Sequence, residues 1–214
     1  KFKKNQFKTL TEYLHEHDYY THADVINKLI VPKQGFDEFH IHDEEEDDLT
    51  SNHISLLHQM KKLSNEKNFF VYLHFSNIHT GIKKEVLDVY HNHSEEFFEN
   101  VELNKSRYSK LFNKAEIYLE SILNEIKKLS LDENSLILIM SDHGVSTGEK
   151  FGEHAYGAFC YDYTLRTFTY FLSKDLPSTE IKQQTRTIDF LPTILDVLKI
   201  PLDNNFGDLD GVSL

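Results

Sequence analysis

An acidic and a basic side chain follow directly on an apolar run in "SLILIMSDHG", residues 135–144. Asp142 can supply a hard oxygen ligand and His143 a borderline nitrogen ligand, and Gly144 lets the backbone turn so that both face the same way. Two ligands do not hold a cation by themselves. The same pair also fits an aspartate that caps a turn beside an exposed histidine, so spacing alone leaves both interpretations open.

Three further side chains with suitable chemistry stand near predicted strand ends. His79 follows an apolar run over residues 69–75, and Lys150 and His154 come within a dozen residues of Asp142. Each has an ordinary structural alternative, as a surface or core histidine or as an exposed loop lysine. Together they would concentrate positive charge on two loops, as an anion-binding pocket requires.

The elements that must position these side chains alternate between strand and helix patterns. The nearly continuous apolar and aromatic run 69–75 predicts a strand covered on both faces, and the runs 135–140 and 167–172 predict two more. Apolar residues at helical spacing predict helices over 10–17, 56–63, 108–129 and 187–200, the last with Pro192 in its first turn.

This order predicts an α/β fold, with a mostly parallel or mixed sheet covered by helices. Ligands of such sheets bind outside the carboxyl ends of the strands, so the loops that hold His79 and Asp142 are expected to converge from neighbouring strands. After residue 17 we expect a turn-rich stretch that closes with "GFDEF", residues 35–39.

The acidic segment "HDEEEDD", residues 42–48, has two interpretations. It can be a solvated loop that leads into a helix N-terminus, where carboxylates suit the helix dipole. It can also be a calcium loop, but it lacks the alternating ligands and the turn glycine of such loops. We therefore favour the solvated loop.

Composition limits the class of protein. The 214 residues, 39% of them hydrophobic, are enough for one domain, or one domain plus an excursion. A formal net charge of -12 argues against a nucleic-acid or anionic membrane partner. No apolar run approaches the roughly 20 residues of a membrane-spanning helix, and the N-terminus lacks the apolar core of a secretory signal. Cys160 is the only cysteine; we expect it to be a small buried residue.

The segment "SDHGVSTGEKFGEHAYG" resembles the metal-binding segment of the sulfatase family, within the alkaline phosphatase-like superfamily. Four further segments are similar to family motifs and follow in the family's order. They are "TLTEYLHEHDYYT", the turn "GFDEF", "FFVYLHFSNIHTG" with the family's active-site histidine, and "RTIDFLPTILDVLKIP" followed by "LDGVSL". The resemblance implies the alkaline phosphatase-like fold.

The family's acidic first strand and its cysteine- or serine-x-proline-x-arginine nucleophile motif have no match in these residues. By resemblance, residues 1–214 are therefore expected to form a single partial catalytic domain, the C-terminal portion, which lacks the first strand. We expect the nucleophile upstream of Lys1. This portion alone is not expected to turn over substrate.

The resemblance also implies roles for the candidate residues. Asp142 and His143 would be ligands of one divalent cation, calcium or manganese. Calcium prefers oxygen ligands such as Asp142, whereas the imidazole of His143 favours a softer ion such as manganese. His79 would contact the sulfate or phosphate oxyanion or protonate the leaving alcohol. His154 would touch the same anion as a catalytic residue, and Lys150 is its rival as a substrate-binding residue.

The resemblance implies a metal-dependent hydrolase of sulfate esters, acting on a small-molecule or glycan sulfate ester. One alternative is a phosphoryl-ester or phosphonate ester hydrolase or transferase of the same superfamily; another is a non-catalytic metal-binding module. If the first strand normally occupies the middle of the sheet, its loss would expose strand edges, so we expect either self-association or a rearranged neighbour to cover them. Family members are often secreted, periplasmic or lysosomal, and the sequence does not decide the compartment.

Overall fold

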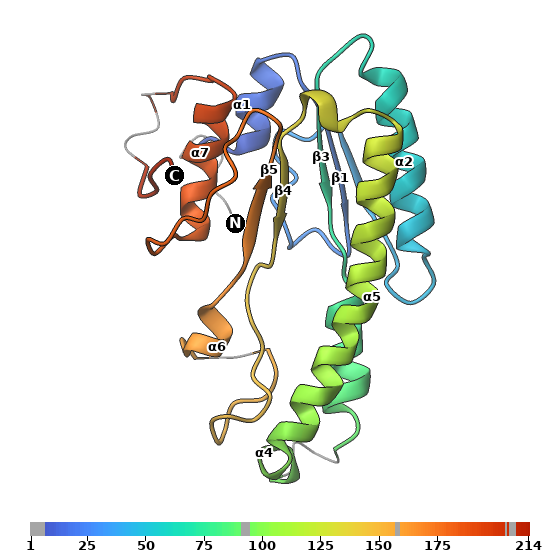
Figure 1. The fold of residues 1–214 in the computed structure, drawn as a ribbon, viewed down its shortest axis with the longest axis vertical. Helices are drawn as coiled ribbons and strands as arrows, with labels where there is room; N and C mark the ends of the chain where they lie inside the picture. The colour runs from blue at the N-terminus through green and yellow to red at the C-terminus, as the bar shows by residue number, and fades with distance from the viewer. Residues whose placement is uncertain (1–6, 91–94, 157–158, 204, 206–208) are drawn as a thin grey trace. The chain divides into compact units, whose positions relative to one another are not determined.

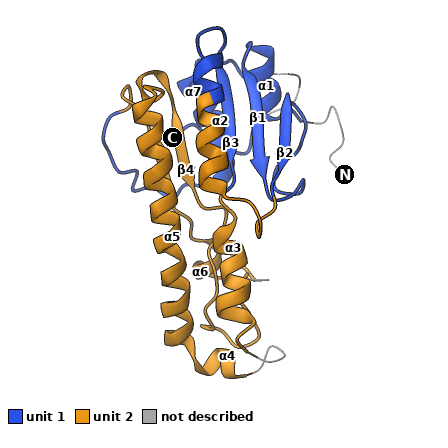
Figure 2. Cartoon of the chain, turned by 90° about the vertical axis from the view of Figure 1, so that its right-hand side faces the viewer, with its two compact units in different colours: residues 1–42, 59–74, 177–214 blue, residues 43–58, 75–176 orange. Residues whose placement is uncertain are grey.

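A computed structural model describes residues 7–90, 95–156, 159–203, 205 and 209–214 (Figure 1). The first six residues of the N-terminal segment considered for a secretory signal lie outside the described part. The chain divides into two compact units (Figure 2). Unit 1 comprises residues 1–42, 59–74 and 177–214, and unit 2 comprises residues 43–58 and 75–176.

Unit 1 contains a three-stranded parallel sheet. Its central strand, β1 (Tyr20–Val25), pairs with β2 (Glu38–Ile41) along one edge and with β3 (Phe69–Leu73) along the other. In this register Asp24 stands beside His40 on β2 and Leu73 on β3. The parallel pairing agrees with the predicted sheet class.

The strand β1 lies in the stretch that the sequence predicted to be turn-rich, so that prediction was wrong. Its sequence YTHADV is short and mixes small, polar and acidic residues, so it shows no apolar run. Pairing on both edges makes it a strand, a tertiary effect that outweighs local propensity. The strand β3 begins where predicted, but its side chains are half-buried and not covered on both faces, and β1 is its only partner among the described strands.

The "GFDEF" turn is fastened to β1. The Asp37 carboxylate accepts hydrogen bonds from the backbone N–H of Thr21 at 2.8 Å and from its hydroxyl at 3.0 Å. Gly35 has φ +83°, and a Cβ there would stand 2.6 Å from the backbone nitrogen of Glu12. The motif therefore locks the start of β2 against β1, and its glycine is required by both backbone conformation and space.

Two helices of unit 1 share a small core. The helix α1 (Leu10–Glu16) begins with a capping box, in which Thr9 and Glu12 each bond the other's backbone N–H. The short helix η4 (Thr187–Asp189) leads into α7 (Phe190–Val197), which carries Pro192 in its first turn as predicted. The buried residues of this core are Tyr13, Leu14, Leu195 and Ile200.

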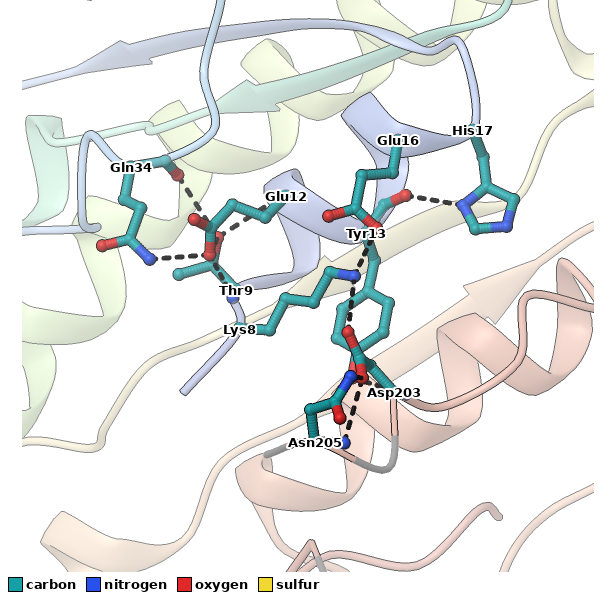
Figure 3. Close-up of polar contacts among 9 residues, drawn as sticks. All are labelled: Lys8, Thr9, Glu12, Tyr13, Glu16, His17, Gln34, Asp203 and Asn205. Atoms are coloured by element: carbon teal, nitrogen blue, oxygen red, sulfur yellow. Dashed lines mark hydrogen bonds and ion pairs between the residues drawn. The ribbon is translucent and has the colours of Figure 1, made fainter. Parts of the chain in front are cut away.

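A lysine fixes the start of α1 to the segment after α7 (Figure 3). The ammonium group of Lys8 lies between the carboxylates of Glu16 and Asp203 and 4.5 Å from the ring centroid of Tyr13. Burial alone would lower the pKa of Lys8, but its hydrogen bonds to both carboxylates outweigh this and raise it. The backbone N–H of Asp203 also donates to the Tyr13 hydroxyl at 3.1 Å.

The C-terminal "LDGVSL" segment packs onto the start of α7. The buried Asp189 accepts a hydrogen bond from the backbone N–H of Val212 at 3.0 Å, and Leu214 N–H donates to the Thr193 hydroxyl at 3.1 Å. A Cβ on Gly211 would stand 2.1 Å from the carbonyl oxygen of Ile188. The aspartate-glycine ending therefore needs glycine for this close approach.

Unit 2 carries the remaining elements. The helix α2 (Leu49–Leu63) begins in unit 2 and ends in unit 1. The others are α3 (Asn77–Gly81), the π-helix η1 (Ile82–Leu87), α4 (Glu96–Glu99), α5 (Val101–Lys128), η3 (Asp132–Asn134), β4 (Ile137–Met140), α6 (Asp162–Leu165) and β5 (Thr169–Leu172). The strands β4 and β5 pair antiparallel. Across the described ranges, no helix is both long and apolar enough to cross a bilayer.

The long helix α5 supplies one wall of the core of unit 2. Its inward face was predicted from residue 108, but the helix begins seven residues earlier. The buried Asn104 explains the difference, because its amide donates to the carbonyls of Phe97 and Thr147 and interrupts the apolar pattern. The core residues are Ile82, Val86, Phe97, Leu111, Val145 and Ala155.

The acidic segment 42–48 leads into α2, as favoured from the sequence. The Asp48 carboxylate accepts from the backbone N–H groups of Thr50 and Ser51, and Asp43 accepts from Glu45 N–H at 2.8 Å. The hydrogen bonds from Ser51 hold the pKa of Asp48 below its usual range. These two carboxylates therefore cap backbone amides at the turn and the helix start.

Candidate metal-binding and active site

Asp142 and His143 follow immediately after β4. The backbone N–H of Ser141 donates to the Phe168 carbonyl at 3.2 Å, which extends the β4–β5 pair to the edge of the site. The N–H of Gly144 then donates to the Thr164 carbonyl at 2.8 Å. A Cβ on Gly144 would stand 2.0 Å from the Tyr163 carbonyl oxygen. This glycine is therefore needed for the close approach of the two backbone segments.

The two candidate ligands point to the same place. The Nε2 atom of His143 lies 3.7 Å from the Oδ2 atom of Asp142, and the side chains are 47% and 73% exposed, respectively. The Nδ1 atom of His143 lies 2.7 Å from the Gly144 carbonyl oxygen. A carbonyl oxygen can only accept, so Nδ1 carries a proton, and Nε2 is the ring nitrogen that can bind a cation.

Asp142 is also tied to its own backbone and influences the neighbouring helix α5. Its Oδ1 atom accepts the backbone N–H of His143 at 2.8 Å. Burial, and then the negative charge of Asp142, raise the pKa of Tyr108 on α5. Oδ1 is thus occupied by a backbone donor, whereas Oδ2 faces the imidazole nitrogen.

The loop after Gly144 is held by its own polar groups. The N–H of Ser146 donates to the Ala155 carbonyl at 2.7 Å, which brings the two ends of the loop together. The Glu149 carboxylate accepts from the backbone N–H of Thr147 at 2.7 Å and from its hydroxyl at 2.8 Å. Burial would raise the pKa of Glu149, but the Thr147 hydrogen bonds outweigh it and lower the pKa.

Glu153 braces the far side of the same loop. Its side chain is buried, accepts the backbone N–H of Phe159 at 2.8 Å and accepts the hydroxyl of Tyr163. Burial and this hydrogen bond raise the pKa of Tyr163. The carboxylates of Glu149 and Glu153 therefore both bond to donors of the protein itself.

His79 lies on the short helix α3 and not in a loop, which corrects the prediction. Its side chain is exposed. The ring of Tyr156 stacks on its imidazole with centroids 4.7 Å apart and an interplanar angle of 27°. The Tyr156 hydroxyl donates to the His79 carbonyl at 2.8 Å. The helix of His79 and the loop that follows Asp142 therefore do meet, as expected from the sequence, through a residue that the sequence did not single out.

His154 and Lys150 occupy different surroundings. The half-buried imidazole of His154 packs against the rings of Phe97 and Phe98, with centroid distances of 4.9 and 4.7 Å. Lys150 is exposed, and its ammonium nitrogen lies 6.0 Å from the ring centroid of Tyr161. Lys150 thus has the freedom of a surface lysine, whereas His154 is held by aromatic rings.

Not all of the candidates are joined directly. In the part of the chain that the structure describes, neither His79 nor Lys150 bonds through its side chain to Asp142 or His143. The strand β3 pairs in unit 1 and β4 in unit 2, so the expectation that they are neighbours stays a prediction.

Cys160 is exposed, so the prediction that it is buried was wrong. It lies in the loop that leads into α6 and does not enter the core.

Sequence reasoning also missed a polar cluster in unit 1. The buried carboxylate of Asp24 accepts the Nδ1–H of His40 at 2.9 Å and that of His42. The only sequence signal was "HIH", which places the imidazoles of His40 on β2 and of His42 directly after it on the same face, because successive residues of an extended chain alternate between faces. Each oxygen of Asp24 is bonded to one imidazole, an arrangement that braces β1 against β2.

Comparison with known proteins identifies the family. The family model named Sulfatase matches residues 1–200. The chain belongs to the sulfatase family. Sulfatases hydrolyse sulfate esters and generally use a divalent metal. A search of curated proteins found no match.

Several solved structures share the fold of this chain. BT1596, described as a 2-O GAG sulfatase, is similar with a TM-score of 0.68, 15% identity and coverage of 100% of this chain and 56% of its own. Ps i-CgsB gives 0.66 and 17%, with coverage of 95% and 55%. BT4656 gives 0.59 and 15%, with coverage of 99% and 64%. These similarities show the alkaline phosphatase-like fold, and the chain spans between 55% and 64% of those structures.

Proposed function

We propose that the protein hydrolyses sulfate esters and that Asp142 and His143 are two ligands of its divalent cation. The observation that carries this proposal is the 3.7 Å separation of Asp142 Oδ2 and His143 Nε2. Atoms that bind one cation at about 2.0–2.4 Å lie close to this distance from each other. Membership of the sulfatase family supports the proposal independently.

The residues present fit a metal ligand pair. Histidines that bind metals almost always donate their other ring N–H to an oxygen acceptor, which fixes the ring and the tautomer. The bond from His143 Nδ1 to the Gly144 carbonyl has this form. The backbone bond to Asp142 Oδ1 similarly fixes the carboxylate, which leaves Oδ2 on the side of the imidazole.

A divalent cation bound there would withdraw negative charge from the sulfate oxygens and from an attacking oxygen nucleophile. His79 would hold the sulfate oxyanion or donate a proton to the leaving alcohol, since its imidazole is exposed and can act as a donor. Lys150, exposed on the loop that follows, would attract the anionic substrate. His154 would complete the anion contact from its position among Phe97 and Phe98.

The nucleophile and the remaining metal ligands are proposed to come from sequence outside these residues, where family members carry them. The cation is proposed to be calcium or manganese, and the imidazole of His143 favours manganese. We propose a sulfated saccharide as substrate, because Ps i-CgsB was solved with k-i-k-neocarrahexaose and BT4656 with D-glucosamine-2-N,6-O-disulfate. We also propose that this chain self-associates through the edges of its sheets.

The first test is thermal unfolding of this chain with calcium, manganese and zinc titrated separately. A cation that binds only the folded state at a hundredfold excess over its Kd adds about 2.7 kcal/mol of stability. We expect this stabilisation in the wild type and its loss in Asp142→Ala. The matched control is Asp175→Ala, which removes another exposed carboxylate of unit 2. A cation response of the wild type that persists undiminished in Asp142→Ala would rule out the ligand assignment.

The second test is hydrolysis by the natural full-length protein of 4-nitrophenyl sulfate and 4-nitrophenyl phosphate. We expect a higher kcat/KM for the sulfate ester, and loss of that activity in Asp142→Ala. A higher kcat/KM for the phosphate ester would instead indicate that the protein is a phosphoryl-ester hydrolase. Cation binding without hydrolysis of either ester would favour a non-catalytic metal-binding module.

A further inference from the structure

The imidazole of His79 needs an external support. It stands on a helix of only five residues and its side chain is exposed, so nothing in α3 itself fixes its rotamer. A catalytic group must keep its geometry, because a displacement of about 1 Å can cost 10²-fold in rate. The ring of Tyr156 meets this need, since it stacks on the imidazole at 4.7 Å and 27°.

Tyr156 also holds the backbone of the same residue. Its hydroxyl donates to the His79 carbonyl at 2.8 Å, so one side chain fixes both the ring and the main chain of His79. Burial, with the charges of Glu44 and Asp88, raises the pKa of Tyr156 to about 12. The hydroxyl therefore stays protonated at neutral pH and remains a donor.

Tyr156 is itself placed by the loop that begins at Asp142. The preceding residue, Ala155, is fully buried and accepts the backbone N–H of Ser146 at 2.7 Å. Ala155 belongs to the core of unit 2 together with Val145, which follows Gly144 directly. The position of the Tyr156 ring is thus set by the same loop that presents Asp142 and His143.

We infer that Tyr156 is a positioning residue that fixes the ring and the backbone of His79 for the proposed catalytic role of this histidine. The inference rests on the proposed role of His79 in sulfate ester hydrolysis. Tyr156 acts through the stack and through the carbonyl hydrogen bond, and it does not itself exchange a proton with substrate. It couples a helix and a loop that are 77 residues apart in sequence.

Two substitutions separate the two contacts. Tyr156→Phe keeps the ring and removes the hydroxyl with its hydrogen bonds, including the one to the His79 carbonyl, whereas Tyr156→Leu removes both the ring and the hydroxyl. Tyr90→Phe is the matched control, because the Tyr90 hydroxyl bonds to Asn104 at 2.7 Å in the same unit and has no described contact with His79. Tyr156→Phe and Tyr90→Phe each remove a hydroxyl and keep the ring, so Tyr90→Phe controls for the loss of a hydroxyl group in unit 2.

The contact is tested by NMR of this chain with labelled histidine. The Cε1–H resonance of His79, assigned by its disappearance in His79→Gln, is expected to carry the ring-current shift of the stacked tyrosine. Tyr156→Leu should remove this shift, and Tyr156→Phe and Tyr90→Phe should retain it. An unchanged His79 resonance in Tyr156→Leu would overturn the inference, whatever the activity of the protein.

The consequence is tested by kinetics of the natural full-length protein on 4-nitrophenyl sulfate. We expect kcat to fall by about 10- to 100-fold in Tyr156→Leu with little change in KM, less in Tyr156→Phe, and not at all in Tyr90→Phe. Wild-type kcat in Tyr156→Leu, with His79→Gln impaired, would overturn the positioning role and leave the proposed function intact. A wild-type kcat in His79→Gln would show that His79 itself has no role in catalysis.

Discussion

The carboxylate of Glu153 accepts a hydrogen bond from the hydroxyl of Tyr163, ten residues further along the chain. The same carboxylate accepts the backbone N–H of Phe159 at 2.8 Å. Because Glu153 is buried, each of these donors compensates for lost hydration of its charge. The pair therefore joins the loop that contains Glu153 and His154 to the helix α6.

We expect Tyr163→Phe to destabilise unit 2, because it leaves one oxygen of the buried Glu153 carboxylate without this donor. The cost should be about 1–3 kcal/mol in the free energy of unfolding, measured by urea denaturation. Tyr161→Phe is the control, since Tyr161 is exposed and its hydroxyl has no hydrogen bond among the described residues. Equal stability of the two variants would contradict a stabilising role of the hydrogen bond from Tyr163 to Glu153.

Gly144→Ala should disrupt the candidate metal loop. The added methyl group would stand 2.0 Å from the Tyr163 carbonyl oxygen, so the backbone of residues 142–145 must move. We expect both lower stability and loss of cation-dependent stabilisation in thermal unfolding.

Gly152→Ala is the control for this substitution. Gly152 has φ +90° but no neighbouring atom within 4 Å of an added Cβ. It should cost about 1–2 kcal/mol through backbone strain alone and retain the cation response. A cation response that survives in Gly144→Ala would show that the loop tolerates the displacement.

His143→Asn should change which cation stabilises the chain. The exchange replaces an imidazole nitrogen with an amide oxygen, and calcium prefers oxygen ligands whereas manganese and zinc accept nitrogen. We expect the ratio of manganese to calcium affinity to fall by about tenfold or more, which corresponds to about 1.4 kcal/mol. Separate titrations followed by thermal unfolding measure this ratio. An unchanged ratio would mean that His143 is not a ligand.

Asp37 should make the stability of unit 1 sensitive to acid. Burial would raise its pKa, but the hydrogen bonds from Thr21 outweigh this and lower it from the ordinary value of 3.8. A lowered pKa means that the ionised group stabilises the fold above pH 3.8 and that this contribution is lost as the pH falls through the folded-state value.

We therefore expect Asp37→Asn to be less stable than wild type at neutral pH. The difference should shrink below about pH 4, where the wild-type carboxylate takes up a proton. Urea denaturation over a pH series measures the difference, with Asp175→Asn as the exposed control. A difference between wild type and Asp37→Asn that is independent of pH would contradict this linkage.

Local patterns in the sequence were sufficient for the long elements. The helix α5 and the strand β4 each repeat one pattern over several residues, so apolar spacing predicted them. The strand β1 was missed because its residues carry no repeated pattern and become a strand by pairing with β2 and β3. The burial of Cys160 was also wrong, because exposure depends on the path of an irregular loop.

By itself the sequence determined the order of elements, the segments that resemble sulfatases, and the adjacency of Asp142 and His143, all of which are properties of neighbouring residues. Only the tertiary structure decided the tautomer-fixing bond of His143, the approach of Tyr163 that requires Gly144, and the stacking of Tyr156 on His79. The stacked pair joins positions 77 residues apart, and the sequence has no local periodicity that records such a contact. Its geometry follows from the packing of α3 and the loop within unit 2.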